Sequence, residues 1–298
     1  MPVRIIISCL AVFLLCGCAG TKKMPEPIVA FIADDSHAHH RRQILDLASG
    51  EAVSFSDLID RLESFDVIFV GEVHTNAEHH LIHVQILQSL INVDPDLLIG
   101  VEFFCRDQQD LLERYFSGDM DEEAFLENIQ WRKTWGYPYH LYRPLLLTAR
   151  REGATVIGLN VRRDIVRKVA REGLAGLDEE ERSGIPRVMD LNDEAHRAYV
   201  REAYERHCHG NLKEFEFFYE AQTVWDETMA ETIAGAVGKH GKKMVVFLGN
   251  GHIMNKFGVP DRTRRRIPIS FATVIPYPLG ETTTLEKGMA DYVWLTGP

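Results

Sequence analysis

The sequence lacks the patterns that mark several common classes of protein. Its 298 residues carry a net charge of −11, so binding to nucleic acid has no electrostatic support. We find no internal repeat, no phosphate-binding P-loop and no zinc-finger spacing of Cys and His. No Cys-x-x-Cys-His segment is present either, which excludes covalent attachment of a c-type haem. The composition, with 45% apolar and 26% charged residues, is sufficient for one globular α/β domain with an insertion.

Cysteine is also scarce. The chain has five cysteines: Cys9, Cys16, Cys18, Cys105 and Cys208. Three of them fall near the N-terminus, which leaves Cys105 and Cys208 for the folded domain. In an oxidising compartment these two either pair or stay free, and their spacing does not decide between the two outcomes.

An apolar segment at the N-terminus indicates export. The run Ile5–Cys16 is interrupted only by Ser8 and follows the positive charge of Arg4. It is too short to span a bilayer as a mature helix, and it fits the core of a signal peptide. We therefore predict that residues 1–17 are a signal peptide that is removed.

The end of that segment matches a bacterial lipoprotein signal. Leu15-Cys16-Gly17-Cys18 supplies an aliphatic residue, a small residue before the cleavage point and the cysteine that receives lipid. Several acyl chains on Cys18 would anchor the protein stably, whereas a single chain gives marginal binding. The prediction is a lipid-anchored protein of the bacterial cell envelope, and Ala19 after the cysteine favours the outer membrane. The alternative is an ordinary secretory signal.

A polar, Pro-containing stretch follows the predicted anchor. Residues 18–41 form a predicted tether, and its three histidines, His37, His39 and His40, are either a weak metal-binding cluster or part of a solvated linker. The α/β domain is expected over residues 42–298, with a mostly parallel central sheet flanked by helices. Between about residues 174 and 240 no strand pattern occurs, so a helical insertion is predicted before the last core strands.

Two predicted strands end in the same polar motif. The run 67–70 is continuously apolar, which is typical of a strand buried in a parallel sheet, and Gly71-Glu72-Val73-His74 follows it. The run 244–248 is similar and is followed by Gly249-Asn250-Gly251-His252. Both strand ends therefore read Gly-x-x-His.

Two further predicted strands carry polar residues at their ends. The run 97–101 leads into Glu102, and the run 155–159 leads into Asn160 and then Arg162. Ligands of open parallel sheets bind at the carboxyl ends of the strands. We therefore predict one shared site built from Glu72, His74, Glu102 and His252.

These residue types suit metal or acid–base chemistry. Two histidines and two carboxylates form a plausible ligand set for zinc, manganese or a similar divalent ion. A bound metal would activate water while a spare carboxylate acts as base, so Glu72, His74, Glu102 and His252 are both metal-ligand and catalytic candidates of a hydrolase. The simpler interpretation is that each histidine only caps a helix or bonds a loop carbonyl.

Other side chains are expected around this pocket. The candidates are His79 and His80 in a helix over residues 76–91, Asn160 and Arg162 at their strand end, and Asp226 on the polar edge of a helical stripe. His79 and His83 are four residues apart and His80 and His83 are three apart, so they share a helical face at a spacing that suits a metal, although a polar helix flank beside the site explains them as well. The aromatic segment Trp131–His140 either lines a ligand cavity or belongs to the core.

Several motifs together resemble a known family. They are Gly-Glu-Val-His-Thr-Asn with its following His pair, Val101-Glu102-Phe103-Phe104, Trp131-x-x-x-Trp135-Gly136, Ala221-Gln222-x-x-Trp225-Asp226-x-x-Met229-Ala230 and Gly249-Asn250-Gly251-His252. This set is similar to the ChaN-type haem-binding lipoproteins of the Tiki superfamily, whose relatives include erythromycin esterases and Tiki proteases. The similarity covers about residues 44–294, and the Ala-Gln-x-x-Trp-Asp segment is its most specific part.

The resemblance implies a lipoprotein that binds haem non-covalently for haem or iron acquisition, as a homodimer linked by two stacked haems. It also implies a tyrosine ligand, since tyrosinate is a hard anionic donor that suits ferric haem. No motif aligns this tyrosine, so the candidates are Tyr199, Tyr204 and Tyr219 of the predicted insertion. The basic stretch Lys256–Arg266, expected to be a loop, either pairs with carboxylates such as haem propionates or rims the surface.

The same resemblance keeps a second function open. In the esterase and protease relatives, Glu and His residues at the matching positions carry catalysis. The primary hypothesis is therefore haem binding, and the alternative is a metal-dependent hydrolase of the esterase or protease type.

Overall fold

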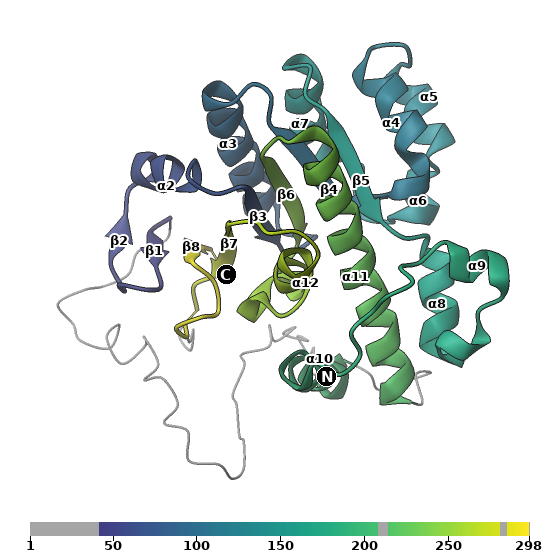
Figure 1. Cartoon of the computed structure of the whole chain (residues 1–298). Helices are drawn as coiled ribbons and strands as arrows, with labels where there is room; N and C mark the ends of the chain where they lie inside the picture. Colours follow the sequence, from purple (N-terminus) through teal and green to yellow (C-terminus); the bar gives the residue numbers. More distant parts are fainter. Residues whose placement is uncertain (1–41, 208–213, 281–284, 298) are drawn as a thin grey trace, which may run out of the picture.

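One eight-stranded sheet forms the centre of the molecule (Figure 1). This computed structural model describes residues 42–207, 214–280 and 285–297. The strand order is β2-β1-β8-β7-β3-β6-β4-β5. Neighbouring strands from β8 to β5 are parallel, whereas β1 pairs antiparallel with β2 and with β8. The predicted α/β fold with a mostly parallel central sheet is confirmed.

The strands are β1 (Ile44–Asp46), β2 (Ala52–Val53), β3 (Val67–Glu72), β4 (Leu98–Cys105), β5 (Val156–Asn160), β6 (Met244–Gly249), β7 (Phe271–Pro278) and β8 (Tyr292–Thr296). The helices are α2 (Phe55–Leu62), α3 (Ala77–Val93), α4 (Gln109–Phe116), α5 (Glu122–Asn128), α6 (Trp131–Thr134), α7 (Tyr139–Arg151), α8 (Arg163–Glu172), α9 (Glu179–Ser183), α10 (Glu194–His207), α11 (Phe215–His240) and α12 (Val259–Arg266). Short 3-10 helices are η1 (Arg106–Gln108), η2 (Leu174–Gly176), η3 (Asn250–His252) and η4 (Met254–Lys256).

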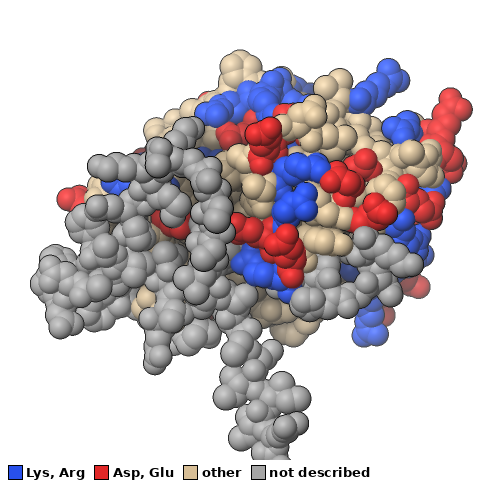
Figure 2. Space-filling view, turned by 90° about the horizontal axis from the view of Figure 1, so that it is seen from below, with Lys and Arg blue, Asp and Glu red and all other residues tan. Residues whose placement is uncertain are grey.

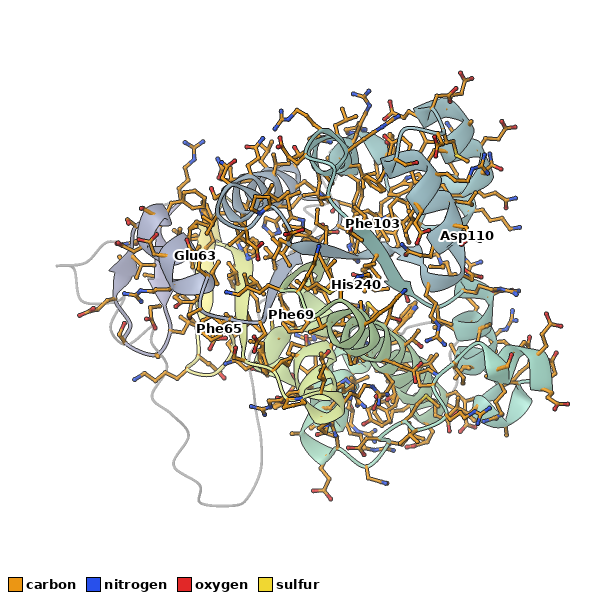
Figure 3. The ribbon with its side chains drawn as sticks, turned by 45° about the horizontal axis from the view of Figure 1, so that its top comes forward. Glu63, Phe65, Phe69, Phe103, Asp110 and His240 are labelled. Carbon is orange, nitrogen blue, oxygen red and sulfur yellow. The ribbon has the colours of Figure 1, made fainter. Side chains whose placement is uncertain are left out.

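The sheet is buried on both faces. Apolar residues of α2, α3 and α7 form one cluster with Val70 and Phe103, and those of α11 and α12 form the other with Phe69. Phe69 and Phe103, labelled in Figure 3, thus belong to clusters on different sides of the sheet. Burial on both sides explains why the strands read as continuous apolar runs rather than as alternating patterns.

Two expected boundaries differ in the structure. β4 does not end before Glu102 but continues to Cys105, because the buried Phe103 and Phe104 extend the apolar run. The stretch Lys256–Arg266 is not a loop, since most of it forms α12, with Pro260 in the first turn where proline is tolerated.

Among its described residues, the chain between β5 and β6 contains no strand, and its helices run from α8 to α11. Met229, Ala230 and Ile233 of α11 pack into the core cluster on one face of the sheet. Helix α10 lies beside α11 (Figure 1). The second half of α11 is therefore a core element of the domain.

Charges of both signs cover the described surface. In the view from below, Lys and Arg side chains are intermixed with Asp and Glu (Figure 2). Over the ranges that the structure describes, no helix has both the length and the apolar character needed to cross a membrane. The predicted signal peptide, lipidation of Cys18 and tether lie outside the described residues, as does Cys208. Cys105 is a buried free thiol.

Candidate functional site

The two Gly-x-x-His motifs lie side by side because their strands pair directly. β3 and β6 are parallel neighbours, with Glu72 opposite Gly249. A Cβ atom on Gly249 would lie 2.9 Å from Cε1 of His74, and one on Gly71 would lie 2.0 Å from Oδ1 of Asn250. The glycine of each motif therefore makes room for a side chain of the other motif.

A pocket of about 150 Å³ opens at these strand ends. Three of the four predicted site residues, His74, Glu102 and His252, line it. Its wall includes the aromatic side chains of Phe103, Trp135, Tyr137 and Trp225. The His74 ring lies with its centroid 4.9 Å from that of Trp135 and 4.7 Å from that of Tyr137. The aromatic segment is therefore divided: Trp135 and Tyr137 line this small pocket, whereas Trp131 belongs to the core.

Glu72 is buried and contacts four side chains. Its Oε1 accepts a hydrogen bond from the Tyr142 hydroxyl at 3.0 Å and lies 2.7 Å from Nδ1 of His74. Its Oε2 lies 3.3 Å from Nδ1 of His80 and 3.4 Å from Nδ1 of His83. Glu72 therefore supports His74 from behind and does not itself line the pocket.

His252 is held between two carboxylates. Its Nδ1 lies 2.5 Å from Oδ1 of Asp226, and its Nε2 lies 3.3 Å from Oε1 of Glu102. The other Asp226 oxygen lies 3.0 Å from Nε2 of His196, and Oε2 of Glu102 accepts the N–H of Gly249 at 2.6 Å. Asp226 of α11 was predicted to face the pocket, but it is fully buried behind His252 and does not itself line the pocket.

Neighbouring charges, rather than burial, decide the protonation states of His252 and Asp226. Burial opposes charging of His252, but the carboxylates of Glu102 and Asp226 outweigh it and raise the pKa of His252 to about 10. Burial would raise the pKa of Asp226, yet the His252 charge and hydrogen bonds from His196 and His252 hold it well below its usual value. At neutral pH His252 is an imidazolium, which donates protons or stabilises negative charge but cannot act as a base.

Around Glu72, the pKa values of the carboxylate and of two histidines shift in different directions. Burial opposes ionisation of Glu72, but the His74 hydrogen bond and the neighbouring imidazoles lower its pKa to about 2. Burial also opposes charging of His74, while its bond to Glu72 and the charge of Glu102 raise its pKa. Burial lowers the pKa of His83 to about 4, so this ring is neutral at pH 7.

The four predicted metal ligands form two pairs, Glu72 with His74 and Glu102 with His252. Among the residues that the structure describes, a different set of three has donor atoms that all lie within 4.8 Å of one another. This set is Glu72, His80 and His83.

Two of the residues at the end of β5 and the start of α8 line the pocket, and one does not. Asn160 lines it, and its Nδ2 donates to the backbone carbonyl of Glu102 at 3.1 Å. Arg162, predicted to face the pocket, lies instead at the surface, where its Nε donates to Asp164 at 3.1 Å. The next residue, Arg163, lines the pocket. The turn into α8 therefore places Arg163, rather than the predicted Arg162, at the pocket.

His79 was also expected at the pocket, and the structure places it elsewhere. Its Nδ1 accepts the N–H of Val73 at 2.9 Å, and its Nε2 lies 3.1 Å from Oγ1 of Thr296 on β8. The His79 side chain is fully buried, and these two contacts connect the first turn of α3 to Val73 and to β8. His80 does not line the pocket either, but its Nδ1 approaches Glu72.

Comparison with known proteins identifies the family. Residues 58–263, more than half of the chain, match the family described as "Haem-binding uptake, Tiki superfamily, ChaN". The chain belongs to this family. The resemblance inferred from the motifs is therefore confirmed.

A solved structure of ChaN from Campylobacter jejuni, described with cofacial haem binding, shares the fold. It is 20% identical with a TM-score of 0.68, and the match covers 84% of this chain and 95% of that one. An erythromycin esterase in its open conformation is 14% identical with a TM-score of 0.49, covering 80% of this chain and 77% of that one. The second likeness is too loose to support a functional argument.

One curated relative is a plant protein. Protein RETICULATA-RELATED 5, chloroplastic, from Arabidopsis thaliana is 23% identical over 270 residues, which is 79% of this chain and 34% of that protein. The chain therefore spans about a third of the length of this relative.

The three tyrosines considered as ChaN-type haem ligands have different surroundings. Tyr199 lines a second pocket, with a volume of about 300 Å³. Tyr219 is fully buried, and the Tyr204 ring packs against that of Phe215 with centroids 5.6 Å apart. Of the three, Tyr199 has the surroundings of a ligand-binding residue.

The Ala-Gln-x-x-Trp-Asp segment of α11 contributes three residues to the surroundings of His252. Gln222, Trp225 and Asp226 are spaced three and four apart, so they share one helical face. The amide Nε2 of Gln222 lies 3.1 Å from Nδ1 of His252, and the Trp225 ring centroid lies 6.1 Å from that of His252. A stripe expected mainly to pack in the core therefore also presents polar groups to the site.

Two buried partners of the site had no signal in the sequence. Tyr142 on α7 donates to Glu72, and His196 on α10 pairs with Asp226. Neither residue lies at a strand end or in a short motif. Only the packing of α7 and α10 brings them to these carboxylates.

Proposed function

We propose that this protein binds haem non-covalently, with Tyr199 as the iron ligand, and serves haem or iron acquisition at the bacterial cell envelope. Membership of the ChaN family supports the ligand class. The observation that supports the ligand residue is the pocket of about 300 Å³ at Tyr199. Most of its lining is apolar or aromatic, including Met254, Phe257 and Tyr277, and Glu202, Asn255 and Glu286 are its polar members. Apolar and aromatic walls suit one face of a porphyrin.

The chemistry of Tyr199 fits ferric iron. Burial raises the pKa of Tyr199, so its phenol is neutral in the absence of ligand. A ferric ion replaces the phenolic proton, and the resulting phenolate is a hard anionic donor. Because a proton leaves when the iron binds, haemin affinity is expected to rise with pH.

Titration with haemin tests this assignment. The full chain in mild detergent is titrated and followed by visible absorbance. We expect saturable binding with a high-spin ferric spectrum, and loss of the tyrosinate spectrum in Tyr199→Phe. Tyr204→Phe is the matched control, because Tyr204 packs on the aromatic rings of Phe215 and Phe218. Tyr199→Phe with an unchanged spectrum would assign the iron to another ligand.

A haem-linked homodimer and a lipid anchor belong to the same proposal. Sedimentation of the haem titration samples is expected to shift from monomer to dimer as haem is added. The sequence Leu15-Cys16-Gly17-Cys18 supports lipidation of Cys18 and attachment to the outer membrane. Labelled palmitate should be incorporated by the wild type and not by Cys18→Ser, and the variant should leave the outer-membrane fraction.

One observation favours a second function, hydrolysis of an ester or peptide. His74, Glu102 and His252 line one pocket. The His252 imidazolium can polarise a carbonyl or protonate a leaving group, and the Glu102 carboxylate can position an attacking water. The two functions are compatible, because Tyr199 and these three residues line different pockets.

A panel of chromogenic esters and peptides tests this second function. If the pocket is catalytic, Glu102→Gln should lose turnover, since the amide keeps the shape but loses the charge. His140→Gln is the control, because His140 is an exposed residue on α7. Activity that survives Glu102→Gln would remove Glu102 from the mechanism.

A further inference from the structure

Three acceptor atoms meet at a buried point next to His74. Oε2 of Glu72 lies 3.3 Å from Nδ1 of His80 and 3.4 Å from Nδ1 of His83, and all three atoms lie within 4.8 Å of one another. The three side chains are buried. Glu72 Oε2 and His83 Nδ1 have no hydrogen-bond partner. Buried polar atoms normally have partners, so this arrangement calls for a ligand.

Main-chain carbonyls fix the tautomers of both histidines. Nε2 of His83 lies 2.8 Å from the carbonyl oxygen of Gly71, and Nε2 of His80 lies 3.1 Å from the carbonyl oxygen of His74. A carbonyl oxygen only accepts, so each Nε2 carries the hydrogen and each neutral ring has a lone pair on Nδ1. Both Nδ1 atoms approach the Glu72 carboxylate, which is also an acceptor.

A single added proton does not give all three of these acceptor atoms a hydrogen-bond partner. If one imidazole gained a hydrogen on Nδ1, it would bond Glu72 and leave the other Nδ1 buried without a partner. A buried acceptor without a partner is unfavourable, because it has lost its hydrogen bonds to water and gained none in exchange. A metal ion would accept all three lone pairs at once.

Two of the three separations between the donor atoms match a tetrahedral ion, and the third is below 4.8 Å. Zinc bonds to imidazole nitrogen and carboxylate oxygen of about 2.0–2.1 Å place neighbouring ligand atoms of a tetrahedron about 3.3–3.4 Å apart. The observed separations of Glu72 Oε2 from His80 Nδ1 and His83 Nδ1 are 3.3 and 3.4 Å. Two histidines and one glutamate are also a ligand set that zinc uses in proteins.

The surrounding contacts are those of metal ligands. Histidine ligands usually donate their other N–H to a carbonyl or carboxylate, which orients the ring. His80 and His83 do so through the carbonyls of His74 and Gly71. The second oxygen of Glu72 is fixed by the Tyr142 hydroxyl and by His74, which leaves Oε2 available.

We propose that Glu72, His80 and His83 bind one zinc ion or a similar divalent ion, with a fourth position for a non-protein ligand. This set shares only Glu72 with the four residues predicted from the strand ends. Through Glu72 the ion is linked to His74, which lines the strand-end pocket. Tyr199 takes no part in it, so failure of haem binding would leave this site untouched.

Metal binding is measured on the full chain, purified in detergent without a polyhistidine tag. His37, His39 and His40 are changed to Ser in every sample, so that the tether does not contribute. Zinc is titrated in competition with a chromogenic chelator. We expect one tightly bound zinc per chain, and cobalt in its place should give the intense visible bands of a tetrahedral ion.

Three variants locate the site. His83→Gln removes a ligand, so it should weaken zinc binding by more than the roughly 10- to 100-fold typical of an outer contact. Tyr142→Phe removes such an outer contact of Glu72 and should fall within that roughly 10- to 100-fold range. His140→Gln, on the exposed side of α7, should bind like the parent. Zinc should also raise the Tm of the parent and not of His83→Gln.

Near-ultraviolet circular dichroism reports whether each variant is folded. If His83→Gln does not fold, Tyr142→Phe decides the matter, because it keeps every donor atom of the site. Zinc affinity unchanged in Tyr142→Phe and in a folded His83→Gln would overturn the assignment. Failure of the parent to hold about one zinc per chain in the chelator competition would overturn it as well.

Discussion

The ring of His74 rests against Gly249, although the two residues come from opposite ends of the domain. A Cβ atom on Gly249 would lie 2.9 Å from Cε1 and 3.2 Å from Nε2 of His74. The contact forms because β3 and β6 are paired strands that end together. Gly249 of the second motif therefore supplies space for the histidine of the first, whereas Gly71 of the first motif makes room for Asn250 and not for His252.

Gly249→Ala should destabilise the domain. The added methyl group must displace the His74 ring, and overpacking of this kind typically costs about 1–3 kcal/mol. Gly251→Ala is the matched control, since a Cβ there meets no atom within 4 Å. Both free energies of unfolding are measured by chemical denaturation. Equal values for the two variants would contradict the packing role of Gly249.

His252 should make stability depend on alkaline pH. Its pKa is raised from 6.5 to about 10 in the folded state, so its contribution is complete below pH 6.5 and is lost as the pH rises toward 10. Asp226→Asn removes one of the two facing carboxylates and should lower the pKa of His252. The difference in unfolding free energy between wild type and variant should therefore shrink as the pH rises from 6.5 to 10.

Nuclear magnetic resonance titration of the His252 ring measures the same effect directly. The His252 signal should titrate at lower pH in Asp226→Asn than in the wild type. His140→Gln, which changes an exposed histidine, should leave the stability profile as it is. A stability difference that stays constant across this pH range would contradict the coupling between Asp226 and His252.

Arg262 should be one of the most costly side chains of α12 to remove. It is buried, and it pairs with Glu227 and donates to the backbone carbonyl of Asp190 at 3.1 Å. Breaking a buried ion pair typically costs about 3–5 kcal/mol. Because Arg266 also pairs with Glu227, Arg262→Ala should cost an amount near the lower end of that range. Arg264→Ala, at an exposed position of the same helix, should cost less than about 0.5 kcal/mol. The free energies of unfolding of Arg262→Ala and Arg264→Ala are compared by thermal or urea unfolding.

The strand-end pocket and the haem pocket should respond separately to mutation. His252→Ala removes the imidazolium of the pocket of about 150 Å³, so any hydrolysis there should be lost. Haemin binding at Tyr199 should remain, because His252 does not line that pocket. Parallel loss of both activities in a folded His252→Ala would show that the two pockets act as one site.

The strand ends could be predicted from sequence because their signal is local. A continuous apolar run followed by Gly-x-x-His marks a buried strand and its polar end, and two such runs in a parallel sheet end at the same edge. His74, Glu102 and His252 accordingly line one pocket. Asp226 could be placed as well, because helical spacing puts it on the same face as Gln222 and Trp225.

Other parts of the site depend on tertiary packing. The sequence pointed to Arg162, whereas Arg162 is the N-cap of α8 and the first residue of that helix, Arg163, lines the pocket. The basic stretch 256–266 looked like a loop because its apolar content is low, yet it forms α12 and buries Arg262. Tyr142 and His196 reach the buried carboxylates only through the packing of α7 and α10.

The most direct measurement is haemin titration of the full chain together with Tyr199→Phe and Tyr204→Phe, followed by absorbance and sedimentation. If Tyr199 ligates haem, the wild type and Tyr204→Phe will bind saturably with a high-spin ferric spectrum and form dimers, and Tyr199→Phe will lose that spectrum. No saturable binding by the wild type would contradict the haem function, and an unchanged spectrum in Tyr199→Phe would contradict the assignment of the ligand.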